Sequence, residues 1–120
     1  MPRNACAYLS DIIDACAAIT AAIRGLDFAG YEANRLIRSS VEREFIIIGE
    51  AIAGLGRVSP EVFDAITRGR RIIDFRNQLT HEYPTVDDAI VWAIVERDVP
   101  VLHRECTSLM QRFAGEGEAG

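Results

Sequence analysis

The sequence predicts an all-α protein, a single domain built as an up-and-down bundle of four or five helices. Apolar residues recur at three- and four-residue spacing through most of the chain, and no segment alternates as a strand does. At 120 residues there is room for one core, and 49% of the residues are hydrophobic. We therefore expect one helical domain over residues 1–114 and a flexible C-terminal tail over residues 115–120.

The first expected helix covers residues 5–25, where Gly25 is a natural stop. The second runs over residues 31–56 with an apolar stripe along one side, but Ile46 and Ile47 point away from that stripe. Because this helix is apolar on more than one side, it must be enclosed in the bundle or meet a second chain. The pattern therefore predicts a homodimer packed partly through the second helix.

The third and fourth helices follow from residues that start and stop helices. Ser59 as N-cap and Pro60 at the first helical position predict a short helix over residues 60–67. The fourth helix, residues 69–83, ends before Pro84, which also disfavours helical geometry in the residue before it.

The last expected helix covers residues 86–113 and contains Pro100. A proline inside a helix removes one backbone hydrogen bond, so a kink or break is expected there. With this helix the predicted bundle is complete.

Net charge limits the partners that the chain can have. The charge of −5 argues against binding nucleic acid over a broad basic face, so we expect no DNA partner. All thirteen basic residues are arginine, which still allows a local site with forked contacts to phosphate or carboxylate.

The cysteines and the N-terminus indicate a cytoplasmic protein with reduced thiols. Cys6, Cys16 and Cys106 are odd in number and lack CxxC spacing, so neither a disulfide framework nor a zinc site is expected. Asp11 and Asp14 interrupt the apolar N-terminal part, which is unlike a signal peptide or a membrane span of ~20 apolar residues. We expect no metal, no cofactor and no membrane partner.

Polar side chains are concentrated in the stretch DFRNQLTHEYP, residues 74–84. On a wheel at ~100° per residue, Arg76 falls within the apolar stripe of the fourth helix. His81 lies ~140° from Arg76, close to Asp74 and one turn from Asn77. An arginine within a buried stripe needs an acidic partner, because an unpaired buried charge is strongly destabilising.

Two interpretations of this cluster are open from the residues alone. In the structural one, Arg76 pairs with Glu42, Glu44 or Glu50 of the second helix, and His81 is a partly exposed cap. In the functional one, the arginine stabilises an anion and the histidine moves protons, which suffices for RNA cleavage without a metal. Despite this angle, Arg76 and His81 can come together if the helix unwinds before Pro84, or if two subunits bring their copies of the motif close to each other.

The same stretch resembles a known family. RNQLTHEY is similar to the Rx4HxY motif of HEPN domains in the HepT-like group, and VEREFIIIGEAI resembles that group's second-helix signature. The resemblance extends to ERDVPVL in the last helix. Members of the group are small helical homodimers that act as ribonuclease toxins, paired with a minimal nucleotidyltransferase of the MntA type as antitoxin.

The resemblance implies a HEPN-like bundle and a toxin of a type VII toxin–antitoxin system. Arg76 and His81 would be the catalytic pair of a metal-independent ribonuclease acting on transfer RNA or messenger RNA, with Asn77 and Asp74 in support. Tyr83 would be the hydroxyl that the nucleotidyltransferase AMPylates. The alternative is a non-catalytic helical dimer that only binds the nucleotidyltransferase.

Three arginines, Arg68, Arg70 and Arg71, lie one to two turns before Arg76. Such a run is usually a solvated helix start, but it is also placed to hold RNA phosphates. We treat these arginines as candidate phosphate contacts.

Overall fold

The computed structural model describes residues 4–81 and 86–119, with side chains as far as residue 113. The all-α fold class is confirmed, since this part of the chain forms six helices and no strand. The number exceeds the expected four or five because the single helix expected over residues 31–56 is divided into two. The helices are α1 (Ala5–Ala22), α2 (Phe28–Ala33), α3 (Arg35–Val58), α4 (Pro60–Asp64), α5 (Gly69–His81) and α6 (Asp88–Ala119).

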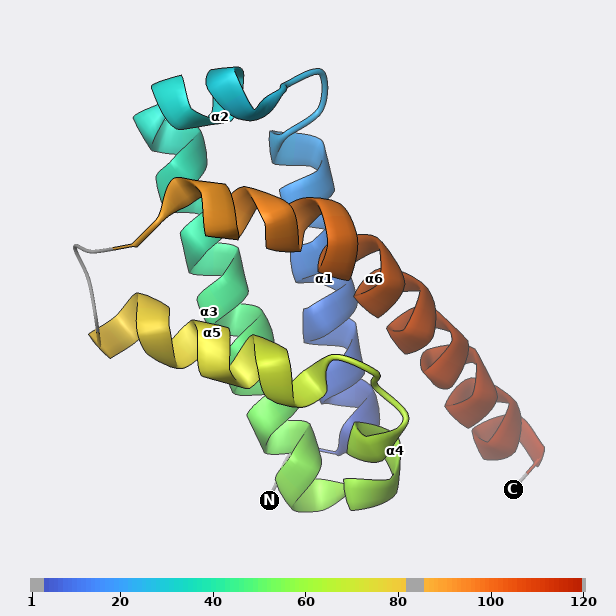
Figure 1. Cartoon of the computed structure of the whole chain (residues 1–120). Coiled ribbons are helices and arrows are strands. Elements are labelled where there is room, and N and C mark those ends of the chain that lie inside the picture. Colours follow the sequence, from blue (N-terminus) through green and yellow to red (C-terminus); the bar gives the residue numbers. More distant parts are fainter. Residues whose placement is uncertain (1–3, 82–85, 120) are drawn as a thin grey trace.

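Two long helices, α1 and α3, lie side by side and form the centre of the fold (Figure 1). α5 crosses α3, while α6 packs on α1, so that each later helix covers part of the central pair. The core is filled mainly by aliphatic side chains, and its largest fully buried members include Tyr31, Phe45, Leu9, Ile48 and Leu102. Packing of amphipathic faces therefore holds the bundle together, as the periodicity predicted.

The single helix expected over residues 31–56 is two helices, α2 and α3, with Asn34 between them. Asn34 has extended backbone (φ −112°, ψ 97°), and its Oδ1 accepts a hydrogen bond from the Ile37 N–H at 3.1 Å. This side chain caps α3, and an N-cap residue cannot also be inside a helix. The apolar pattern continues across the break, which is why periodicity alone missed it.

The short helix after Ser59 also differs from the prediction, because α4 ends at Asp64 instead of near Thr67. The turn after α4 is held by α6: the Glu105 carboxylate accepts the Thr67 backbone N–H at 3.0 Å and the Thr67 hydroxyl as well. A backbone N–H that bonds to another helix is not available to extend α4.

The last helix is continuous through Pro100, so the expected break is absent, and Figure 1 shows its axis bending part-way along. α6 begins at Asp88, and the preceding Asp87 accepts the Ala89 N–H at 2.9 Å. The helix runs to Ala119, although the sequence indicated an end near residue 113 and a tail over residues 115–120.

No membrane span was expected, but α1 is long and apolar enough to be a candidate for one. This assignment rests on length and composition alone, and the core helix of a globular protein can meet the same two criteria. Leu9, Ile12, Cys16 and Ile19 are fully buried in the core that α1 shares with α3 and α6. Packing inside the bundle therefore accounts for these four side chains, although only 28% of the helix is buried.

Candidate functional site

Arg76 projects from α5 onto α3, as its place in the apolar stripe predicted. Its side chain is 17% exposed, and Nη1 lies 3.1 Å from Oε1 of Glu50 on α3. Nε donates a hydrogen bond to Oδ1 of Asn77 at 2.9 Å. Of the three glutamates expected as partners, Glu50 is thus the one paired with Arg76. Glu50 itself is 67% exposed, so the guanidinium lies at the edge of the core next to solvent.

The arginine reaches Glu50 because α3 carries a glycine where α5 crosses it. A Cβ atom on Gly49 would lie 2.4 Å from Cβ and 2.6 Å from Cγ of Arg76. Contacts this short do not occur between real side chains, so only glycine permits this crossing. Sequence analysis did not single out Gly49, although a glycine inside a strongly apolar helical run is a signal of close packing.

His81 is the last residue of α5 and is exposed. The helix is regular from Arg76 to His81, so it does not unwind between the two residues. Their side chains therefore leave the helix ~140° apart, with Arg76 turned to α3. The described part of α5 therefore does not bring the two side chains together by itself, and the segment between His81 and Pro84 lies outside the described residues.

The other predicted site residues have different surroundings. Asn77 binds Arg76, so it supports the arginine directly. Asp74 is exposed and lines a groove between α5 and α6. Tyr83 lies outside the described residues.

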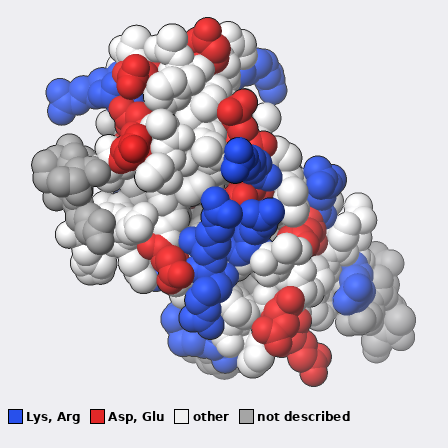
Figure 2. Space-filling view, viewed as in Figure 1, with Lys and Arg blue, Asp and Glu red and all other residues white. Residues whose placement is uncertain are grey.

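The candidate phosphate contacts Arg68, Arg70 and Arg71 line this same groove, which has a volume of about 500 Å³. Figure 2 shows a stripe of basic side chains on the face formed by α5 and α6. Arg68 and Arg71 are not simply solvated, because they pair with the buried Asp98 of α6 at 3.3 and 3.5 Å. Sequence analysis missed Asp98, since nothing local indicates that a carboxylate in α6 is buried beside the start of α5.

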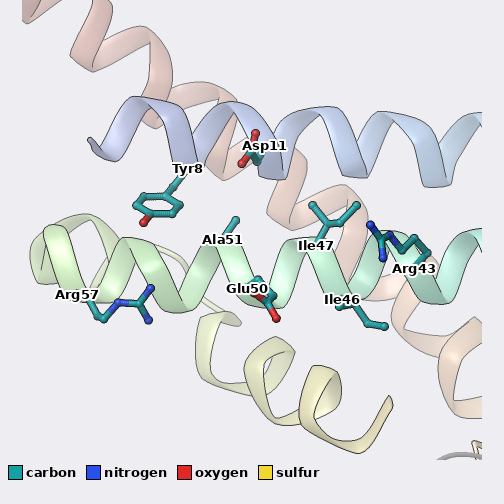
Figure 3. Close-up of a pocket in the computed structure, with 8 residues that line it drawn as sticks. All are labelled: Tyr8, Asp11, Arg43, Ile46, Ile47, Glu50, Ala51 and Arg57. Carbon is teal, nitrogen blue, oxygen red and sulfur yellow. The ribbon is translucent and has the colours of Figure 1, made fainter. Parts of the chain in front are cut away.

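A second groove, of about 510 Å³, lies along α3 on the side of α1. Figure 3 shows Ile47 pointing toward α1, while Ile46 and Glu50 point to the α5 side. Ile46 and Ile47 are partly buried, and they pack against the core while still reaching the surface. The groove thus joins an apolar patch to the carboxylate that holds Arg76.

Within residues 4–81 and 86–113, no group of three or more histidine, cysteine or acidic side chains is placed to hold a metal ion. Two of the cysteines are poor nucleophiles. Burial raises the pKa of Cys16 and of Cys106 to about 12, so both stay protonated at neutral pH. The polar chemistry of the described surface therefore centres on α5.

Comparison with known proteins places the chain in a family. The family model described as Ribonuclease HepT-like matches residues 12–109 of the chain. The chain belongs to the HepT-like ribonuclease family. No solved structure gave a significant match.

Individual HepT-like relatives cover nearly the same residues. The chain is 30% identical over 103 residues to "Putative RNase MJ1380" of Methanocaldococcus jannaschii, which covers 86% of this chain and 94% of the relative. It is also 30% identical over 106 residues to "Probable ribonuclease HepT" of Thermococcus cleftensis, covering 85% of this chain and 92% of the relative. RNA cleavage is thus the activity that names the family.

The close crossing of α3 and α5 predicts that Gly49→Ala destabilises this HepT-like fold. The new methyl group would push Arg76 and α5 away from α3, and overpacking of this kind costs about 1–3 kcal/mol. Urea unfolding followed by circular dichroism measures the loss. Gly56→Ala on the same helix is the matched control, because its Cβ would come no closer than 3.3 Å to Phe63. Equal losses in the two variants would contradict a special role for the Gly49 crossing.

Proposed function

We propose that the chain is the toxin of a type VII toxin–antitoxin system, a cytoplasmic, metal-independent ribonuclease that cuts transfer RNA or messenger RNA. The observation that carries the proposal is the membership of the HepT-like ribonuclease family over residues 12–109. The motif of α5 supports it, since a paired arginine and an exposed histidine lie within two turns of one helix.

The proposed chemistry is attack of a 2′-hydroxyl on the neighbouring phosphate. The 2′-oxygen bonds to phosphorus as the bond to the 5′-oxygen breaks, leaving a 2′,3′-cyclic phosphate and a 5′-hydroxyl. His81 takes the 2′-hydroxyl proton or gives a proton to the leaving oxygen, because imidazole titrates near neutral pH. The Arg76 guanidinium offsets the negative charge that builds on the phosphorane.

The positions of Arg76 and His81 favour a homodimer with a composite site. Within one chain the two side chains leave α5 in different directions, and in the proposed composite site a second copy supplies one of them. The groove on α3 is a suitable surface, since it combines Ile46 and Ile47 with Glu50, the partner of Arg76. A second subunit seated there would come close to the arginine.

A catalytic role predicts that His81→Ala abolishes RNA cleavage. General acid or base catalysis contributes about 10²–10⁴-fold, and loss of an exposed side chain leaves stability within about 0.5 kcal/mol. Cleavage of labelled RNA in EDTA measures the activity, and thermal unfolding checks the fold. The matched control is His103→Ala, which removes the other histidine of the chain and should retain activity.

The alternative function is that of a non-catalytic dimer which only binds a nucleotidyltransferase. Cleavage that persists in His81→Ala in the presence of EDTA would contradict the proposed chemistry. A wild-type protein that binds the nucleotidyltransferase but cuts no RNA would establish the alternative.

The composite site predicts a dimer at micromolar concentration and its loss in the double variant Ile46→Asp with Ile47→Asp. Two carboxylates in the α3 groove would have to be desolvated in the interface, so the dimer should dissociate and RNA cleavage should fall with it. Light scattering measures the mass, and circular dichroism checks that the helices remain. Leu36→Asp is the control, because Leu36 is on α3, 83% exposed and outside the groove. A monomeric wild type would rule out both the dimer and the composite site.

We further propose that a MntA-like nucleotidyltransferase silences the toxin by attaching AMP to Tyr83. A phosphate and a purine two residues from His81 would compete for Arg76 and block RNA. Of the other two tyrosines, Tyr31 is fully buried, which leaves Tyr8 as the one that a transferase could reach in the folded protein.

The proposed modification predicts mass increases in steps of one AMP on wild type and none on Tyr83→Phe. Co-expression with a nucleotidyltransferase of this type, followed by intact-mass measurement, tests it. Tyr8→Phe serves as the matched control and should be labelled like the wild type. Equal labelling of Tyr83→Phe would place the modification on another residue.

A further inference from the structure

Asp98 of α6 is the one charged side chain that is fully buried in the part of the chain whose side chains are described. Its Oδ1 accepts a hydrogen bond from Nη1 of Arg68 at 3.3 Å, whereas its Oδ2 forms an ion pair with Arg71, 3.5 Å from Nε, and accepts no hydrogen bond. The Asp98 side chain is inaccessible to solvent, whereas the side chains of Arg68 and Arg71 are 41% and 51% exposed. The buried carboxylate thus pairs with two arginines whose side chains both remain at the surface.

An anchored arginine at the surface is suited to bind an anion. A guanidinium carries five N–H groups in a rigid fork, and one carboxylate uses only part of that capacity. A long side chain normally loses rotamer freedom when it binds, but here a hydrogen bond to Asp98 already favours one position of Arg68, and an ion pair with the same carboxylate attracts Arg71. Two such side chains next to each other form a preorganised site for a phosphate group.

The groove in which they lie extends along α5 toward the candidate catalytic histidine. Arg71, Asp74, Gln78 and His81 fall within ~80° of one another on the helix, and the first three line the groove. Arg71 and His81 are ten positions apart, a rise of about 15 Å along α5. An RNA strand that follows this face therefore reaches His81 from the arginines within a few nucleotides.

We propose that Asp98 is a positioning residue which holds Arg68 and Arg71 as a clamp for a backbone phosphate of the RNA substrate, a few nucleotides from the bond that is cut. The inference rests on the proposed ribonuclease function and adds to it the way in which the substrate is held. Arg70 differs from the clamp residues, because its guanidinium lies 5.7 Å over the ring of Phe63 and not on Asp98.

A clamp held by Asp98 and a mere patch of positive charge predict opposite effects of Asp98→Asn on RNA affinity. Removing a negative charge beside two arginines makes the groove more basic, so a mere basic patch would bind RNA more tightly. A clamp that loses its anchor binds more weakly, and we expect about a tenfold loss of affinity for a single-stranded RNA oligonucleotide. Fluorescence anisotropy in the His81→Ala background measures binding without cleavage, and circular dichroism checks the fold.

The salt dependence of binding tests the two arginines individually. Each phosphate contact of a single strand contributes about 0.7 to the slope of log affinity against log salt. Arg68→Gln and Arg71→Gln should each lower the slope by about that amount, and each leaves Asp98 one partner. Arg70→Gln should cost less affinity, and Arg24→Gln, in the exposed turn after α1, is the control for net charge.

The outcomes separate this inference from the function on which it rests. Tighter or unchanged binding in Asp98→Asn, or slopes for the clamp variants equal to that of Arg24→Gln, would overturn the clamp while wild-type cleavage stands. If Asp98→Asn does not fold, the slopes of the two arginine variants decide the question. A wild type that neither binds nor cuts RNA would overturn both proposals.

Discussion

The crossing of α5 over α3 at Gly49 is the constraint on which the rest of the site depends. A side chain at this position would collide with the Cβ and Cγ atoms of Arg76, so the absence of one brings the two helices close together. The arginine stem then lies against the α3 backbone, and its guanidinium reaches Glu50 at the edge of the core. A charged group can occupy an apolar helix face here because the charge emerges next to solvent, where desolvation costs less than in the interior.

α5 is held at its start by a different helix. Asp98 and Glu105 of α6 are seven residues apart and so lie on nearly the same face, where they bind Arg68 and Arg71 and the backbone of Thr67. Together with the Gly49 crossing, these contacts fix the beginning and the middle of α5. His81, at the exposed end of the helix, therefore lies on an element that contacts both α3 and α6, which suits the proton-transfer role proposed for it.

The sequence predicted those features that depend on local pattern. It placed the start of α5 near residue 69, and it offered Glu42, Glu44 and Glu50 as acidic partners because an arginine in an apolar stripe needs an acid; the structure shows that Glu50 is the partner. It did not separate α2 from α3, because Asn34 interrupts a helix whose apolar spacing continues on both sides. It also missed Gly49 and Asp98, whose partners lie 27 residues away or more in the chain, and helical periodicity carries no information on contacts between helices.

The two grooves give the proposed functions separate surfaces. The lining of the α3 groove and that of the α5–α6 groove share no residue, so the proposed subunit contact and the proposed RNA contact use different residues. A chain of net charge −5 can bind a polyanion only if local contacts outweigh the overall repulsion. Repulsion from the whole protein opposes binding at long range, and salt screens it, whereas contacts between guanidinium groups and phosphates act at short range. In the proposed function, RNA would be recognised by a few arginines at short range, and Arg68 and Arg71, which pair with buried Asp98, are the two that we propose for this role.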